Sequence, residues 1–326
     1  MLKLIGKKVL NIIPVLFGIV TLVFFIMRLI PGDPAAVLLG DNATIDEVAR
    51  IRALLGLDRN IFIQYLSYLR SLLSLDLGRS IFQSLPVIDV IMGSFPATLE
   101  LSLAAMVITL VISLPLGILS AVKQNSPVDY IGMIFAQIGI SMPVFWIGLL
   151  LILAFSVNLQ ILPSFGRGLP ITRCIVELFT TGSARSLIES LRRLLMPAVS
   201  LGIMGSALVS RMIRSTMLEV LESDYVRTAR AKGTKENAVI IKHAFRNALL
   251  PVVTVVGLQF GSLLGGSIVT ETVFAWPGIG RVIVTAISQR DFPLVQGGVI
   301  CFALAFAIIN LLVDMLYMVI NPKIRH

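Results

Sequence analysis

Continuous apolar runs of about 20 residues recur along this chain, and they constrain its fold more than any other feature. A helix of that length crosses a hydrocarbon core about 30 Å thick. The runs lack the alternating pattern of a membrane barrel, so we expect helices. With 56% hydrophobic residues and a mean hydropathy of +0.94, the chain cannot bury this apolar surface in one ordinary water-soluble domain. Six spans are predicted: residues 9–29, 98–121, 131–157, 194–210, 249–270 and 297–320.

The first run follows three lysines, which is also how a secretory signal peptide begins. Its apolar part is too long for a signal peptide and no clear A-x-A cleavage site follows, so we interpret it as an uncleaved first span. Four prolines fall inside or at the edges of later spans: Pro115, Pro143, Pro197 and Pro251. Kinks are predicted at the first two.

Basic residues set the orientation. With the N-terminus inside, the inner segments carry fourteen basic residues against five acids, whereas the longer outer segments carry twelve against eleven. The positive-inside rule then places both termini in the cytoplasm. The net charge of +9 thus belongs to the inner membrane face, where it contacts lipid, and no nucleic-acid partner is needed to explain it.

An outer insertion, residues 31–97, separates the first two spans. Thr44 and Glu47 predict a capping box for a helix from Ile45 to Leu55, and Gly56 predicts its stop. A second helix over 61–73 repeats an apolar face through Ile61, Tyr65, Leu69 and Leu72. The expected organisation is an N-terminus with its span (1–30), a small helical insertion (31–97), a membrane core (98–320) and a cytoplasmic tail (321–326).

A second polar region, residues 211–248, lies between spans four and five on the inner side. We expect a short helix from Asp224 that ends at Gly233, then a second helix capped by Thr234 and running toward Asn247. Ala229 and Gly233 share one face, where the groove of another protein can approach the backbone, and flanking arginines can pair with its acids. The alternative is a positively charged loop that touches lipid headgroups.

Residues 224–251 resemble the cytoplasmic loop of ABC importer permeases, whose motif is E-A-A, three residues, Gly, and an apolar stretch ending in Leu-Pro. Here Arg227-Thr228-Ala229 stands in place of E-A-A, Gly233 keeps the glycine, and Leu250-Pro251 closes a longer spacing. This version is similar to that of the peptide/nickel subfamily. Other segments that resemble the subfamily are residues 28–34, 54–58, 76–80, 271–281 and 313–325. The Pro-Gly-Asp-Pro turn and the long insertion resemble the B-type permease, although Leu75 stands where a glycine is frequent.

The resemblance implies an all-α polytopic membrane protein of about six transmembrane helices, with the type I ABC importer permease fold and a helical extracytoplasmic insertion, in a bacterial inner membrane. It implies a homologous C-type permease, two ATPase subunits and an extracytoplasmic binding protein as partners. A helix over about 224–232 would sit in an ATPase groove and convert nucleotide-site closure into rocking of the spans. The implied coupling residues are Asp224, Tyr225, Arg227, Ala229, Arg230 and Gly233.

The residues themselves agree that ATP hydrolysis belongs to another chain. No G-x-x-x-x-G-K-[ST] occurs, because the single Gly-Lys pair, Gly6-Lys7, lacks the rest of the motif. We therefore expect a transport subunit, not an enzyme, with no cofactor of its own and ATP and Mg on the partners. Cys174, in a predicted loop, and Cys301, in a predicted span, predict neither a disulfide nor a metal site.

Small residues repeat every fourth position on two spans: Gly202, Ser206 and Ser210 on span four, and Gly257, Gly261 and Gly265 on span five. Such stripes permit close helix packing, and alternatively they line a path or slide during alternating access. Gln259 and Ser262 lie near the second stripe, so span five is our first candidate for pore lining.

Charges near the membrane are few. Arg28 and Glu100 sit at span edges, where a long side chain can reach water, and only Asp314 is deep. We interpret Asp314 as a packing partner, with Asn310 one turn earlier, and not as a proton relay. This weakens the alternative of an ion-coupled secondary transporter.

The outer segment between the last two spans offers a candidate gate formed by Glu271, Trp276, Pro277 and Gly278. It is either a re-entrant element or an interfacial turn anchored by an aromatic residue, and both place Trp276 at the outer surface. The substrate expected from the resemblance is a short peptide, a dipeptide or oligopeptide. Nickel or a metal chelate is the alternative, and a membrane enzyme remains a further one.

Overall fold

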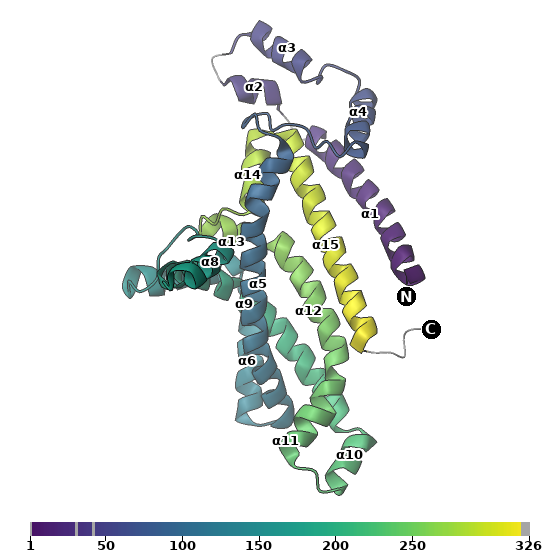
Figure 1. The fold of residues 1–326 in the computed structure, drawn as a ribbon, viewed down its shortest axis with the longest axis vertical. Helices are drawn as coiled ribbons and strands as arrows, with labels where there is room; N and C mark the ends of the chain where they lie inside the picture. The colour runs from purple at the N-terminus through teal and green to yellow at the C-terminus, as the bar shows by residue number, and fades with distance from the viewer. Residues whose placement is uncertain (1, 30–31, 41–42, 321–326) are drawn as a thin grey trace. The chain divides into compact units, whose positions relative to one another are not determined.

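The computed structural model describes residues 2–29, 32–40 and 43–320. All the regular secondary-structure elements in those ranges are helices (Figure 1). The expected all-α fold is therefore confirmed. The predicted tail, 321–326, and the side chain of Asp314 lie outside what is described. The chain divides into two compact units: Met1–Ala97 with Pro277–Ala307, and Thr98–Trp276 with Ile308–His326. Helices α5 (Val87–Val122) and α15 (Phe292–Ile320) contribute residues to both.

The first unit contains α1 (Leu2–Leu29), α2 (Pro34–Leu39), α3 (Ile45–Leu54), α4 (Ile61–Leu73) and α14 (Ile279–Gln289), with parts of α5 and α15. Its core forms where apolar side chains of α1, α5, α14 and α15 meet, among them Met27, Ile91, Ile283 and Leu294. Helix α2 contacts both α3 and α14.

Both helices predicted in the insertion are present. The Thr44 hydroxyl accepts from the Glu47 amide at 3.3 Å and the Glu47 carboxylate accepts from the Thr44 amide at 2.8 Å, so the capping box is confirmed. Gly56, with φ of +66°, follows the end of α3. After α4, Leu75 adopts φ of +57°, a left-handed conformation that a glycine adopts without steric cost.

The second unit contains α6 (Pro127–Ser141), α7 (Val144–Leu151), η1 (Ile152–Asn158), α8 (Ile171–Thr181), α9 (Arg185–Leu221), α10 (Asp224–Ala231), α11 (Glu236–Ala238), η2 (Val239–Phe245), α12 (Arg246–Gly266) and α13 (Ile268–Val273). Helix α9 is central, because α6, α7, α8 and α12 all contact it. Its small residues permit this: a Cβ on Gly205 would lie 2.6 Å from the Thr109 hydroxyl of α5.

In the described part of the chain, four helices are long and apolar enough to cross a membrane: Leu10–Leu29, Val87–Val122, Arg185–Leu221 and Phe292–Val313. The number is six if each of two bent pairs is one span, Pro127–Ser141 with Val144–Asn158 at 104° and Glu236–Leu249 with Pro251–Gly265 at 55°. The kink predicted at Pro143 is confirmed: Pro143 caps α7 without a side-chain bond and the chain turns there. No break occurs at Pro115, where α5 continues.

Candidate coupling elbow and transport path

The predicted stop at Gly233 is confirmed and has a defined geometry. The Gly233 amide donates to the Arg230 carbonyl at 2.9 Å and the Thr234 amide to the Ala229 carbonyl at 3.3 Å, the two bonds of a Schellman motif. Gly233 has φ of +75°, yet nothing lies within 4 Å of the place where its Cβ would be. The position therefore requires glycine for its backbone conformation and not for space.

Thr234 does not cap the next helix, so that prediction is wrong. Helix α11 begins at Glu236, after Lys235, and has no side-chain cap. The amide of Thr234 already closes the Schellman motif of α10, which ties this residue to the preceding helix. Beyond α11 the chain continues through the π-helix η2 into α12, so the second arm of the elbow joins the span directly.

Ala229 faces inward, contrary to the prediction of a face open to a partner. It is 8% exposed and packs with Val226 and Val239, both fully buried, and with Val220. The two apolar positions, 226 and 229, are three apart and fall on one side of α10, which the helix buries against α9 and η2. The surface of α10 left to a partner is the opposite side.

That opposite side is polar. Asp224, Tyr225 and Arg227 are exposed, and the Arg227 and Asp224 side chains approach only to 3.7 Å. Arg230 pairs with Glu236 across the elbow at 2.8 Å, so its predicted acid lies in the same chain. The Glu236 carboxylate raises the pKa of Arg230.

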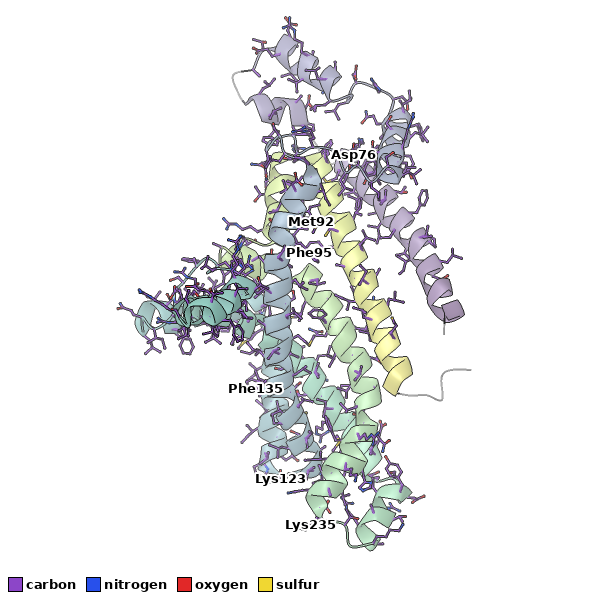
Figure 2. All side chains as sticks on the ribbon, viewed as in Figure 1. Asp76, Met92, Phe95, Lys123, Phe135 and Lys235 are labelled. Carbon is purple, nitrogen blue, oxygen red and sulfur yellow. The ribbon has the colours of Figure 1, made fainter. Side chains whose placement is uncertain are left out.

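A packed platform carries the elbow. Ile213 and Met217 of α9, Ala244 of η2 and Val252 of α12 form one buried cluster with Ala121 at the end of α5. Figure 1 shows α10 and α11 at one end of this unit, and Figure 2 labels Lys123 and Lys235 there. Side-chain contacts therefore connect α10, through Val239 of η2 and Val220 of α9, with this platform.

An ion pair that sequence reasoning missed joins α6 to α9 within the same unit. Arg214 donates from Nε to Asp129 Oδ1 and from a terminal nitrogen to Oδ2, both at 2.7 Å. The Asp129 side chain is 3% exposed and also accepts from the Asn125 amide at 3.0 Å. The only signal for this pair in the sequence was the presence of an acid, Asp129, in an otherwise basic inner segment. That signal did not indicate which residue it contacts.

The glycine stripe of α12 has two different environments. A side chain on Gly257 would collide with Val313 of α15, and Gly261 is buried, whereas Gly265 is open. Gln259 is half-buried, with its amide nitrogen 3.4 Å from a Cβ built on Gly205, and Ser262 is exposed. The structure thus places the first part of the stripe in helix packing and leaves Ser262 and Gly265 at the surface of this unit.

Trp276 is fully buried, so the prediction that it lies at the outer surface is wrong for its side chain. The Trp276 amide donates to the Glu271 carbonyl at 2.8 Å after a left-handed Ala275 with φ of +49°, which folds the chain back at the end of α13. The Arg167 guanidinium lies 5.9 Å from the Trp276 ring centroid.

Glu271 is also fully buried. Its carboxylate accepts from the Thr98 hydroxyl at 2.7 Å and from the Ser267 hydroxyl at 3.0 Å. Pro277 and Gly278 belong to the other unit, where Gly278 caps α14. The candidate gate is therefore divided between the two units, with Glu271 and Trp276 in one and Pro277 and Gly278 in the other.

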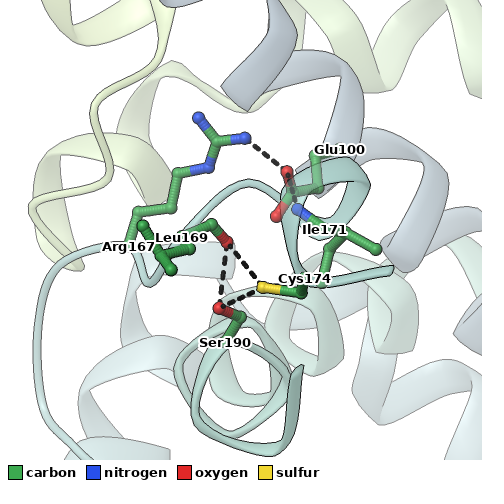
Figure 3. A network of polar contacts seen from close by, with 6 residues as sticks. All are labelled: Glu100, Arg167, Leu169, Ile171, Cys174 and Ser190. Atoms are coloured by element: carbon green, nitrogen blue, oxygen red, sulfur yellow. Dashed lines mark hydrogen bonds and ion pairs between the residues drawn. The ribbon is translucent and has the colours of Figure 1, made fainter. Parts of the chain in front are cut away.

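Glu100 does not simply extend to water. It pairs with Arg167 and accepts from the Ile171 amide at 3.4 Å, as Figure 3 shows. Beside this pair, Ser190 donates to the Leu169 carbonyl at 2.9 Å. Cys174 lies in α8 and not in a loop, with its sulfur 3.4 Å from the Ser190 hydroxyl, and both cysteines are free.

These bonds tie the segment before α8 to α5 and α9. Among the described residues, no group of three His, Cys, Asp or Glu side chains is placed to hold a metal ion.

The comparisons with known proteins agree with this architecture. Residues 113–326 match the family described as binding-protein-dependent transport system inner membrane component, and residues 1–104 match the N-terminal family of the same systems. The chain belongs to this family. It is a multi-pass inner-membrane component of an ABC importer and not an enzyme, and its family works with ATPase and substrate-binding components.

Curated relatives match from end to end. The dipeptide transport system permease protein DppB of Alkalihalophilus pseudofirmus is 44% identical over 333 residues, covering 100% of both chains. DppB of Escherichia coli K12 is 43% identical, covering 100% of this chain and 99% of its own. The glutathione transport system permease protein GsiC of Salmonella choleraesuis is 40% identical over 326 residues, with full coverage of both.

Among solved structures, a chain of the inward-facing MetNI methionine ABC transporter is similar in fold. Its TM-score is 0.57 at 17% identity, and the match covers 71% of this chain and 96% of the MetNI chain. The likeness confirms the importer permease fold.

Proposed function

We propose that this chain is the B-type permease of an ATP-driven importer of short peptides, paired with a homologous C-type permease above two ATPase subunits. The observation that carries the proposal is the end-to-end similarity, at 43–44% identity, to permeases named for dipeptide transport. The similarity to glutathione permeases fits the same substrate class, because glutathione is a tripeptide. A binding protein delivers the peptide from outside, and ATP and Mg stay on the ATPases.

The elbow is the coupling element in this proposal. The exposed side of α10, with Asp224, Tyr225 and Arg227, lies in an ATPase groove, while Val226 and Ala229 press on Val239. Since η2 continues into α12 and packs on α9, movement of the groove shifts both helices together. The face that carries the elbow is cytoplasmic, and both termini are on that side.

Uptake of a labelled dipeptide tests the substrate. Vesicles would contain this chain with the permease, ATPases and binding protein encoded beside it. We expect ATP-dependent accumulation of the labelled dipeptide. Other short peptides should compete with this uptake, and nickel should not. If nickel or a metal chelate accumulates and peptide does not, the proposed importer architecture stands and the proposed peptide substrate is refuted.

A substitution at Gly233 tests the coupling role. Valine at a φ of +75° costs about 1–2 kcal/mol of backbone strain and disturbs the turn between the arms. We expect Gly233→Val to lower both peptide-stimulated ATP hydrolysis and uptake about fivefold or more, with the chain still inserted. Gly182, at φ of +70° with equally open surroundings at the end of α8, is the matched control. Equal activity of Gly233→Val and wild type would refute the coupling role.

A further inference from the structure

Helix α4 of the outer insertion carries apolar side chains on two sides. An amphipathic helix of a water-soluble subdomain carries them on only one. One side holds Tyr65 and Tyr68, and it packs on α1. The other side exposes Phe62, Ile63, Leu66 and Leu73, with Leu66 65% and Leu73 88% exposed. Arg70 is the single charged residue of the helix. Apart from the polar residues Gln64, Ser67, Arg70 and Ser71 the helix is apolar, and an exposed apolar face of this kind indicates contact with a partner or with lipid.

The contacts of α4 on α1 fix its depth. Tyr65 and Thr21 are hydrogen-bonded through their hydroxyls at 2.7 Å, and the Tyr68 ring stacks on Phe24 with centroids 5.4 Å apart. Thr21 lies eight residues before Leu29, the end of the apolar span, which is about 12 Å along the helix. Half of a hydrocarbon core is about 15 Å, so these rings reach well inside the leaflet.

The remaining contacts keep α4 at that place. The Arg28 side chain donates to the Gln64 side-chain oxygen at 3.1 and 3.0 Å. Gln64 meets Arg28 and Tyr68 meets Phe24, and Figure 1 shows α4 beside the C-terminal half of α1. The Tyr68 hydroxyl is buried and has no hydrogen-bond partner in the described part of the chain.

We propose that α4 is an interfacial membrane helix, which lies in the leaflet where α1 ends and turns its outer side toward lipid acyl chains. In the proposed orientation this is the extracytoplasmic leaflet. On the apolar span of α1, Phe17 and Leu22 are also exposed. Arg70 is compatible with this contact with lipid, because its long side chain can reach a lipid phosphate from the headgroup boundary. The insertion is thus anchored in the bilayer and is not wholly a solvent-exposed cap.

Spin labels on single cysteines test this placement in the assembled transporter, in vesicles of phosphatidylethanolamine and phosphatidylglycerol. The two native cysteines are first replaced by serine, and uptake is checked. Labels at Leu66→Cys and Leu73→Cys are compared with Leu22→Cys on α1, which reports lipid, and Ile45→Cys on α3, which reports water. Collisions with oxygen report lipid contact and collisions with a water-soluble nickel chelate report water.

We expect the ratio of oxygen to nickel collisions at Leu66 and Leu73 to match that at Leu22 and to exceed that at Ile45 several-fold. A ratio like that at Ile45 would overturn the proposal, because the helix would then face water. Low collision rates with both reagents would also overturn it, since a partner subunit would then cover the face. The readout is independent of the transported substrate, so a failed peptide assay leaves it intact.

Discussion

Replacing Asp129 by asparagine removes one half of the ion pair between α6 and α9. Arg214 now gives Asp129 two charge-assisted bonds of 2.7 Å, and the carboxylate is 3% exposed. Breaking a buried pair from one side costs about 3–5 kcal/mol, because it leaves a charge without its partner. The Arg214 side chain is 24% exposed, so water compensates part of this and we expect a loss of about 2–4 kcal/mol.

Thermal unfolding of the assembled transporter measures the effect. A loss of that size lowers the midpoint by roughly 5–15 °C for a unit of this length. Asp129→Asn combined with Arg214→Gln should recover part of the loss, since neither charge is then left alone. The exposed pair of Glu189 and Arg193, 2.8 Å apart on α9, supplies the control.

We expect Glu189→Gln to change the midpoint by less than about 3 °C, since exposed pairs contribute about 0–1 kcal/mol. A midpoint for Asp129→Asn within the range of that control would refute the reasoning. So would a double variant that is less stable than Asp129→Asn alone.

Three further predictions follow from packing, burial and capping. Gly257→Leu should displace Val313 and lower the unfolding midpoint by several degrees. Thr98→Val should leave the buried Glu271 carboxylate without one donor and cost about 1.5–3 kcal/mol, measured as a lower midpoint. The Thr44 amide lowers the pKa of Glu47 below its ordinary 4.5, so the capping box stabilises α3 above that pH and is lost as pH falls through the lower, folded-state pKa. Hydrogen exchange of α3 amides, corrected for intrinsic rates, should accelerate over that range.

Matched substitutions separate these effects from general damage. Gly265→Ala places a methyl group in open space on the same helix as Gly257 and should leave the midpoint unchanged. Glu47→Gln keeps an acceptor for the Thr44 amide but no longer titrates, so the acceleration in α3 at low pH should disappear. An unchanged midpoint for Gly257→Leu, or for Thr98→Val, would contradict the packing or the buried hydrogen bond described above.

Local signals predicted local structure well. The Thr44 and Glu47 pair marked the start of α3, and Gly233 marked the end of α10, because a cap involves residues only three to five apart. The proline at 143 likewise marked the break before α7. The number of spans follows from apolar length alone, provided that each bent pair is one span.

Long-range placement could not be predicted in this way. Asp129 meets an arginine 85 positions away, and Glu100 meets one 67 positions away, and no periodicity in either segment encodes such pairs. Ala229 was assigned to the wrong side of α10 because the pattern of small residues does not say which neighbour covers them. Trp276 is buried because the chain turns at Ala275, a residue without the usual preference for positive φ.

The stiffness of the elbow has a thermodynamic consequence. Its two arms are joined by the Arg230–Glu236 ion pair and by the packing of Val226 and Ala229 on Val239, and η2 continues into α12. Under the proposed function, an ATPase that docks on α10 and a peptide that favours one arrangement of α9 and α12 act on the same equilibrium. Linkage requires that each changes the other's affinity by the same factor. The arrival of substrate on the far side of the membrane then changes the affinity with which the ATPase binds α10.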